Sequence, residues 1–162
     1  MRRTVAALLL AAVVLTGCGD DGDGGAAPDP SASQATSGKP AVEIPAGPPP
    51  TALKVDDITV GTGEAAADGK LLTMQYVGVI YRDRREFDSS WGGAEPFQFT
   101  LGTDPVIQGW QLGIKGMKVG GRRRLIIPPD LAYGQQGQGD IGPNETLVFV
   151  VDLVAVNDPA GG

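Results

Sequence analysis

The chain of 162 residues has no histidine and only one cysteine, Cys18. Without histidine, Ser-His-Asp and Cys-His catalysis and most zinc sites are excluded. A single cysteine cannot form an internal disulfide, so no such crosslink holds the fold. Neither a P-loop nor a Gly-x-Gly-x-x-Gly dinucleotide signature occurs. We therefore expect no metal and no cofactor, and any activity must come from other groups.

Positive charge is scarce as well. The chain has 13 Lys and Arg against 19 Asp and Glu, a formal net charge of −6. An acidic chain is a poor partner for nucleic acid, and it gains little from attraction to anionic lipid. The most concentrated basic run, Arg122-Arg123-Arg124, falls in a strand-like segment. We interpret it as a solvated face with one arginine turned inward, and anion binding is the alternative.

The first eighteen residues have the layout of a bacterial export signal. Met1-Arg2-Arg3 is followed by an apolar stretch over 5–15 and then by Thr16-Gly17-Cys18. The stretch is too short for a stable membrane span, and Leu15-Thr16-Gly17-Cys18 resembles a lipobox. We expect residues 1–17 to be a signal peptide and Cys18 to carry lipid, which would anchor the protein in the lipid bilayer at the outer face of the bacterial cytoplasmic membrane. The alternative is an ordinary signal peptide with an incidental cysteine.

Residues 18–50 lack the composition of a folded core. They are rich in Gly, Ser, Asp and Pro, with one isoleucine and no aromatic residue. Such a segment cannot bury enough surface to offset its chain entropy. We expect a disordered tether that spans roughly 30 Å and is dispensable for folding. Residues 51–158 would then be one domain, followed by a short tail at 159–162.

Beyond residue 50 the pattern is that of a β-rich domain. The spacing of Ile107, Trp110 and Ile114 predicts one short helix over 107–115, which contains two glycines and needs tertiary packing to hold it. Runs of β-branched and aromatic residues predict strands over 54–60, 70–81, 96–101, 122–127 and 146–156. We therefore expect an α+β domain, an antiparallel sheet of about five strands wrapped around one short α-helix.

Alternation within the two longest predicted strands indicates which side chains face the core, because successive residues point to opposite faces of a sheet. In the strand over 70–81 the core-facing set is Leu72, Met74, Tyr76 and Gly78. In the last strand it is Leu147, Phe149, Val151 and Leu153.

Six ordered motifs carry a resemblance to a known family. They are Phe87-Asp88-Ser89-Ser90, Pro96-Phe97-Gln98-Phe99, Val106-Ile107-Gln108-Gly109-Trp110, Gly116-Met117-Lys118-Val119-Gly120-Gly121, Ile127-Pro128-Pro129-Asp130-Leu131-Ala132-Tyr133-Gly134 and Pro143-Asn144-Glu145-Thr146-Leu147-Val148-Phe149. Together they resemble the FKBP-type peptidyl-prolyl cis-trans isomerases, from about Leu53 to Asn157. With the lipobox, the chain resembles a bacterial lipoprotein form of that family.

The resemblance implies roles for the matching residues. Asp88, the hydroxyl of Tyr133 and the backbone N–H of Ile107 are implied to be the catalytic groups that hydrogen-bond ligand polar atoms. Trp110 is implied to be the floor beneath the substrate prolyl ring. The other implied substrate-binding residues are Tyr76, Phe87, Phe97, Val106, Ala132, Ile141 and Phe149.

Each of these residues has a simpler interpretation when it is taken alone. A tryptophan on a helix face is usually core, and so are Tyr76 and Phe149 on strands. Asp88 before two serines would cap a turn. Only their joint order favours a ligand pocket.

The chemistry that the resemblance implies needs no histidine or metal. Rotation about an X–Pro amide has a barrier of about 18–20 kcal/mol from resonance, while the isomers differ by about 0.5–1 kcal/mol. An apolar pocket disfavours the charge-separated planar amide, and placed hydrogen bonds favour the twisted one. The implied partners are X-Pro segments of unfolded or exported proteins and macrolide ligands such as rapamycin, bound by a monomer.

Two departures from the family pattern bear on activity. The family commonly has an arginine near Gly93 that can pair with the pocket aspartate, and none is present here. The loop over 134–143 is polar, with only Ile141 apolar, where the family usually offers apolar or aromatic residues. We therefore keep an alternative to the membrane-tethered isomerase: a prolyl-peptide binding module or holdase chaperone with little turnover.

Overall fold

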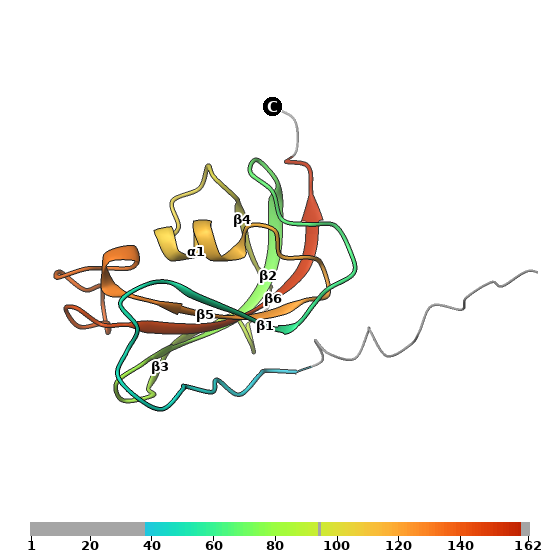
Figure 1. Ribbon diagram of the computed structural model, residues 1–162. Coiled ribbons are helices and arrows are strands. Elements are labelled where there is room, and N and C mark those ends of the chain that lie inside the picture. The colour runs from blue at the N-terminus through green and yellow to red at the C-terminus, as the bar shows by residue number, and fades with distance from the viewer. Residues whose placement is uncertain (1–37, 94, 160–162) are drawn as a thin grey trace, which may run out of the picture.

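The computed structural model describes residues 38–93 and 95–159, which form a twisted sheet with one short helix on one side (Figure 1). Its elements are β1 (Lys54–Thr59), β2 (Leu71–Ile80), β3 (Glu86–Ser89), β4 (Phe97–Thr100), α1 (Gln108–Ile114), β5 (Arg122–Ile127), the 3-10 turn η2 (Pro129–Leu131) and β6 (Leu147–Asn157). The predicted helix and all five predicted strands are confirmed, and their ends differ from the predicted ends by no more than one residue.

The strands pair antiparallel in the order β1-β5-β6-β2-β3, and β4 also pairs with β2. β2 is long enough to hold two partners on the same edge, β4 along 71–74 and β3 along 77–79. β3 is a sixth strand that the sequence pattern does not predict. It has only four residues and no β-branched side chain, so pairing with β2 decides its conformation rather than intrinsic propensity.

One face of the sheet forms the main core together with α1. The side chains predicted to face the core on the two longest strands do so, since six of them are buried and Tyr76 packs against them. Burying one such leucine or valine stabilises the fold by roughly 1.5–3 kcal/mol. The buried six are Leu72, Met74, Leu147, Phe149, Val151 and Leu153.

The two glycines of α1 allow the helix to lie directly on β5. A Cβ at Gly109 would collide with the side chain of Ile127, and one at Gly113 would come within 2.7 Å of Leu125 Cδ2. The residues that weaken the helix as an isolated segment are therefore the ones that let it approach the sheet. Tertiary packing pays their propensity cost of about 1 kcal/mol each.

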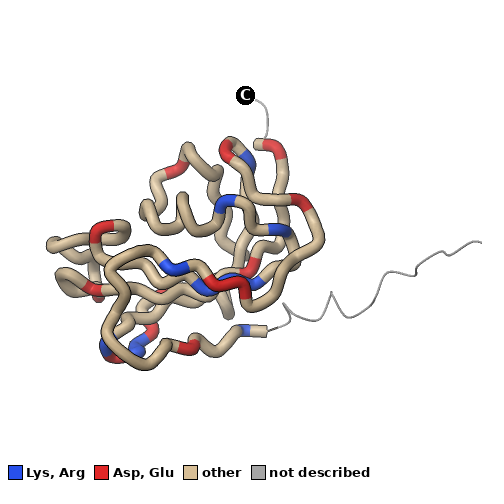
Figure 2. The backbone as a smooth tube through the Cα atoms, in the orientation of Figure 1, with Lys and Arg blue, Asp and Glu red and all other residues tan. Residues whose placement is uncertain are grey.

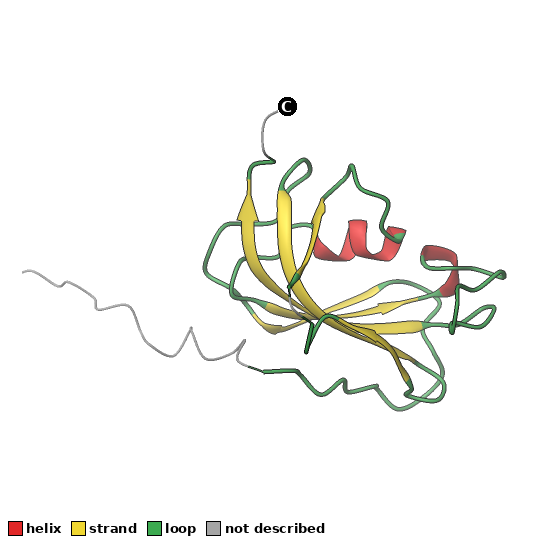
Figure 3. Cartoon of the chain, turned by 180° about the vertical axis from the view of Figure 1, so that it is seen from behind, coloured by secondary structure: helices red, strands yellow, loops and turns green. Residues whose placement is uncertain are grey.

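The opposite face of the sheet is covered by residues 38–50, which we call the strap. The strap has no helix or strand of its own and passes across this face toward β1 (Figure 3). Val42 and Ile44 pack against the side chains that point away from α1, which are Val77, Val79, Tyr81, Ile126 and Val148. The prediction of a disordered tether up to residue 50 is thus wrong for residues 38–50. The apolar back of the sheet gives this weakly apolar segment a surface to bury, which composition alone does not reveal.

Polar contacts fix the strap at both ends. The hydroxyl of Tyr81 lies within hydrogen-bonding distance of three strap carbonyl oxygens, those of Pro45 (3.1 Å), Gly47 (3.3 Å) and Pro48 (3.3 Å). Near the other end, Lys39 Nζ lies 2.7 Å from Glu86 Oε1. The domain therefore includes the strap.

The arginine run is not a solvated face, so that interpretation is wrong. The three side chains expose only 15%, 11% and 21% of their surface, and each pairs with an aspartate on a neighbouring strand. Blue and red segments accordingly lie beside one another along β1 and β5 (Figure 2). Because every guanidinium already faces a carboxylate, the run is also a poor anion site. The pairs are Arg122–Asp152, Arg123–Asp57 and Arg124–Asp56.

Several sequence-based expectations lie outside the described residues. These are the signal peptide over 1–17, the lipidated Cys18 and the part of the tether before residue 38, together with residues 160–162 of the tail. Within the part of the chain that the structure describes, no helix has both the length and the apolarity needed to cross a membrane.

Candidate active site

Trp110 lies at the centre of an aromatic cluster between α1 and the sheet. Its side chain is 5% exposed, and α1 holds it against β5 through the close contact at Gly109. Three rings meet it edge to face, with centroid distances of 5.2 Å for Tyr76, 5.7 Å for Phe97 and 5.3 Å for Phe149. Edge-to-face pairs of this kind each stabilise by about 0.5–1.5 kcal/mol beyond area burial. The indole is thus a rigid floor surrounded by aromatic walls.

Gly78 on β2 makes room for one of these walls. A Cβ at this position would come within 2.7 Å of both Phe149 Cε1 and Phe87 Cζ. Without that atom, Phe87 meets Phe149 edge to face at 5.5 Å. The predicted position of Gly78 on the core face is therefore confirmed, and its lack of a side chain allows β3 to contribute Phe87 to the site.

The loop between β4 and α1 brings Val106 and Ile107 to the cavity. Gln111 fixes this loop because its side-chain oxygen accepts from Gly102 N (2.9 Å) and its nitrogen donates to Asp104 O (3.1 Å). Ile107 immediately precedes α1, and its carbonyl accepts from the first turn of the helix. Within residues 38–93 and 95–159 the backbone N–H of Ile107 has no hydrogen-bond acceptor. It is therefore available to a ligand.

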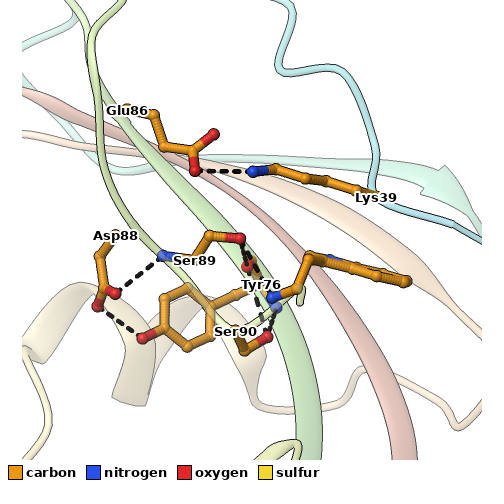
Figure 4. A network of polar contacts seen from close by, with 7 residues as sticks. Lys39, Tyr76, Glu86, Asp88, Ser89 and Ser90 are labelled. Atoms are coloured by element: carbon orange, nitrogen blue, oxygen red, sulfur yellow. Dashed lines mark hydrogen bonds and ion pairs between the residues drawn. The ribbon is translucent and has the colours of Figure 1, made fainter. Parts of the chain in front are cut away.

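Asp88 and Tyr76 form a hydrogen-bonded pair (Figure 4), and both line the cavity described below. The Tyr76 hydroxyl donates to Asp88 Oδ2 over 2.6 Å, and the backbone N–H of Ser89 donates to Asp88 Oδ1 over 2.8 Å. Asp88 is exposed, on β3, whereas Tyr76 is half-buried, on β2. In the described chain no lysine or arginine forms an ion pair with Asp88. The carboxylate is held by neutral donors alone.

Both site tyrosines remain neutral hydrogen-bond donors. Burial, followed by the hydrogen bond to Asp88 and its charge, raises the pKa of Tyr76 well above its usual value of 10. Burial and the charge of Asp88 also raise the pKa of Tyr133. No intramolecular hydrogen bond to the Tyr133 hydroxyl is present in the described residues. The hydroxyl can therefore donate to a ligand oxygen.

These groups surround a cavity of about 300 Å³. Nine of the eleven residues predicted for the site line it, so the structure brings together side chains from β2, β3, β4, α1, β6 and two loops. They are Tyr76, Phe87, Asp88, Phe97, Val106, Ile107, Trp110, Tyr133 and Phe149.

The two remaining predicted residues lie beside the cavity. Ile141 lines an adjoining hollow of about 240 Å³, which shares Phe87, Asp88 and Tyr133 with the main cavity. Ala132 packs against the core next to Tyr133 and lines neither space. Its position in the motif reflects the turn after η2 rather than a surface offered to a ligand.

Sequence reasoning missed Gln138 and Pro105, which also line the cavity. Gln138 lies in the polar loop, and two backbone hydrogen bonds of 2.9 Å to Ile141 hold it at the cavity rim. Gly137 precedes it with a φ of +66°, a conformation that favours glycine. The Gly-flanked Gln-Gly pattern predicts a turn, but it does not reveal that the turn projects over the cavity.

A larger hollow of about 480 Å³ lies elsewhere, between the strap and residues 143–146. Its lining consists mainly of strap residues, Arg82, Arg84 and the polar turn before β6, with Tyr81 as its one aromatic residue. A site for a prolyl ring needs an apolar and rigid lining, so we assign function to the smaller aromatic cavity. No cluster of three or more possible metal ligands occurs among the described residues.

A cavity lined mainly by aromatic and aliphatic side chains, with a few placed hydrogen-bond donors and no cysteine or histidine, suits a ligand that is bound by shape rather than by covalent chemistry. The sequence profile of the family described as FKBP-type peptidyl-prolyl cis-trans isomerase matches residues 62–154. The chain belongs to this family and is a peptidyl-prolyl cis-trans isomerase by class.

Similar proteins of known sequence and structure support this family membership. The chain is 52% identical to an FK506-binding protein of Streptomyces anulatus over 120 residues, which cover 73% of this chain and 97% of the relative. It is 49% identical to a probable FK506-binding protein of Corynebacterium glutamicum over 117 residues, 72% of this chain and 98% of the relative. Among solved structures, FkpA from Escherichia coli matches with a TM-score of 0.61 and 44% identity, over 67% of this chain and 49% of that one. AtFKBP13 matches with a TM-score of 0.60 and 36% identity, over 66% and 94% respectively.

Proposed function

We propose that the aromatic cavity around Trp110 binds the prolyl ring of X-Pro segments and accelerates their isomerisation. The observation that carries this proposal is the packing of Trp110 by Tyr76, Phe97 and Phe149 at the base of a cavity with free donors at its rim. The apolar walls exclude water and disfavour the planar, charge-separated amide. The Ile107 N–H and the Tyr133 hydroxyl then donate to ligand carbonyls and favour the twisted geometry.

Asp88 would orient rather than attack. Its carboxylate accepts from Tyr76 and from the N–H of Ser89, which leaves further lone pairs for a polar group of the ligand. The hydrogen bond from the Tyr76 hydroxyl to Asp88 also fixes the ring of Tyr76 as a wall of the cavity. No bond is made or broken in this reaction, so positioning and electrostatics are sufficient.

The proposal includes a membrane tether. The motif Leu15-Thr16-Gly17-Cys18 favours lipidation of Cys18, and the strap leaves the sheet on the face opposite the cavity. An isomerase anchored outside the membrane would meet exported chains, for which slow X-Pro isomerisation can limit folding. Cys18→Ala should release the protein from the membrane fraction. If the N-terminal peptide of the wild-type protein has the mass expected without lipid, lipidation is contradicted.

Ligand binding tests the cavity assignment. Rapamycin should raise the melting temperature and quench Trp110 fluorescence, measured in a Trp91→Phe background so that only one indole reports. Phe97→Ala should weaken the binding because it removes a wall of the cavity. Absence of any thermal shift at high micromolar ligand would count against the assignment.

A binding module or holdase with little turnover is the second candidate. The polar loop favours it, since Gln138 stands at the cavity rim where an apolar side chain would exclude water better. Turnover on several X-Pro peptides separates the two candidates.

A further inference from the structure

Arg123 on β5 joins three elements of the fold. Its Nε and Nη2 donate to the two carboxylate oxygens of Asp57 on β1, over 2.6 Å and 3.1 Å. Its Nη1 donates to the carbonyl oxygen of Gly113 in the last turn of α1, over 2.8 Å. The side chain is 11% exposed, the least of the three arginines in the run. The Asp57 carboxylate thus orients the Arg123 guanidinium so that its remaining nitrogen donates to the C-terminal end of α1.

Gln111 joins α1 to the loop before it, but few directional contacts join the helix to β5. The helix is seven residues long, has no side-chain cap at its N-terminus, and carries no basic residue in its last turn. Its contacts with β5 are apolar, Ile127 at Gly109 and Leu125 at Gly113. Apolar contacts of this kind are non-directional. The hydrogen bond from Arg123 is directional and satisfies a carbonyl that a helix end leaves without an intrahelical partner.

The position of α1 matters because its first turn forms part of the cavity. Trp110, the floor, lies in the helix, and Ile107, whose N–H is available to a ligand, immediately precedes it. A shift of the helix along β5 would move both groups relative to Asp88 and Tyr133, which stand on other elements. Misplacement by about 1 Å can reduce catalysis by as much as about a hundredfold.

We propose that Arg123 is a positioning residue of the isomerase: by joining Asp57 to the Gly113 carbonyl, it sets the place of α1 and hence of the Trp110 floor. This inference rests on the proposed role of the cavity. Arg123 touches no ligand and acts only through the helix.

The same strand supplies a matched control. Arg124 also pairs with an aspartate of β1, Asp56, and also donates to a backbone carbonyl, that of Glu43. Its side chain points to the opposite face, toward the strap, and it makes no hydrogen bond to α1. Arg123→Met and Arg124→Met therefore each remove a guanidinium, an ion pair and a carbonyl contact, but only the former releases the helix.

The test compares these two variants in the full chain, by protease-free isomerisation of X-Pro peptides well below both melting temperatures. Arg123→Met should lower kcat/KM by about tenfold and change the emission of Trp110 in a Trp91→Phe background. Arg124→Met should keep the wild-type kcat/KM and emission, although it loses stability. Equal kcat/KM and equal emission in the two variants would overturn the inference.

Two further outcomes are informative. If Arg123→Met does not fold, Arg123→Lys takes its place beside Arg124→Lys. Lysine cannot hold both the carboxylate and the carbonyl in a fork, so a partial loss confined to position 123 supports the inference and wild-type turnover overturns it. If the wild type itself has no turnover, the proposed isomerase function fails, while Trp110 emission still reports whether Arg123 positions the floor.

Discussion

The hydroxyl of Tyr81 lies 3.1 Å from the carbonyl oxygen of Pro45, which joins the end of the second strand to a segment more than thirty residues earlier in the chain. Tyr81 is 8% exposed, and its ring belongs to the small core on the face of the sheet away from α1. The strap is therefore part of the domain, although its composition resembles that of a linker.

Removal of the strap should destabilise the domain. A chain that begins at Thr51 exposes Tyr81 and the apolar residues around it, and we expect a loss of about 2–4 kcal/mol and a melting temperature lower by about 10 °C. A chain that begins at Gly38 should keep the melting temperature of the full chain. Thermal unfolding of the three chains tests this.

Point variants in the full chain separate the effect of burying strap side chains from the effect of shortening the chain. Val42→Ser with Ile44→Ser should reproduce much of the loss in the full chain, whereas Ala41→Ser with Ala46→Ser, at exposed strap positions, should not. Equal melting temperatures for the Thr51 and Gly38 chains would show instead that the strap adds nothing to stability.

Two phenylalanines of the cavity should differ in their effect on stability. Phe149 is 4% exposed, so Phe149→Ala should cost about 3–5 kcal/mol. Phe97 is only half-buried, so Phe97→Ala should cost less stability. Both substitutions nevertheless remove a wall beside Trp110 and should lower kcat/KM. Paired urea unfolding and turnover measurements check this. A turnover defect that follows stability loss alone would argue against a role for Phe97 in the cavity.

Alkaline pH should weaken the fold through the site tyrosines. The pKa of Tyr76 is raised in the folded state, so below pH 10 both folded and unfolded forms carry the proton. Above pH 10 the unfolded form loses it first, and stability falls by up to about 1.4 kcal/mol per pH unit for each such phenol. Urea unfolding between pH 8 and pH 11 should show this fall, and Tyr76→Phe should make it shallower. An unchanged slope in Tyr76→Phe would mean that other groups, such as Lys70, whose pKa is also raised, account for it.

Gln138 should influence which residue is accepted before proline. Gln138→Leu places an apolar side chain at the cavity rim. We expect kcat/KM to rise by roughly threefold for peptides with an apolar residue before proline, relative to peptides with a polar residue there. Gln135→Leu, an exposed substitution in the same loop that does not line the cavity, is the control. If both variants shift the preference equally, the effect belongs to the loop as a whole and not to the position of Gln138.

The strands that carry the cavity could be predicted because their signal is local. The alternation through Leu72, Met74 and Tyr76 fixes one face of β2, and the spacing of Ile107 and Trp110 fixes one face of α1. β3 could not be predicted, because a four-residue strand without β-branched side chains owes its conformation to its pairing with β2.

The strap and the arginine run escaped prediction for another reason. Whether Val42 packs on the sheet depends on side chains on its back, such as Val77 and Val148, which lie more than thirty residues away in sequence. Likewise, the aspartates that pair with Arg122, Arg123 and Arg124 lie on β1 and β6, so the local sequence pattern shows only a run of charges. Gln138 was missed because a turn signal does not say which surface the turn covers.

We propose that the cavity around Trp110, with donors at its rim, accelerates X-Pro rotation. The most direct measurement is kcat/KM in a protease-free assay for the wild type, Asp88→Ala and Tyr133→Phe, with Tyr81→Phe as the control for loss of a hydroxyl outside the cavity. We expect clear turnover by the wild type and Tyr81→Phe, and a loss of tenfold or less, about 1.4 kcal/mol, in each site variant. If the wild type barely exceeds the uncatalysed rate, or both site variants retain full turnover on several peptides, the account of catalysis in this cavity is contradicted.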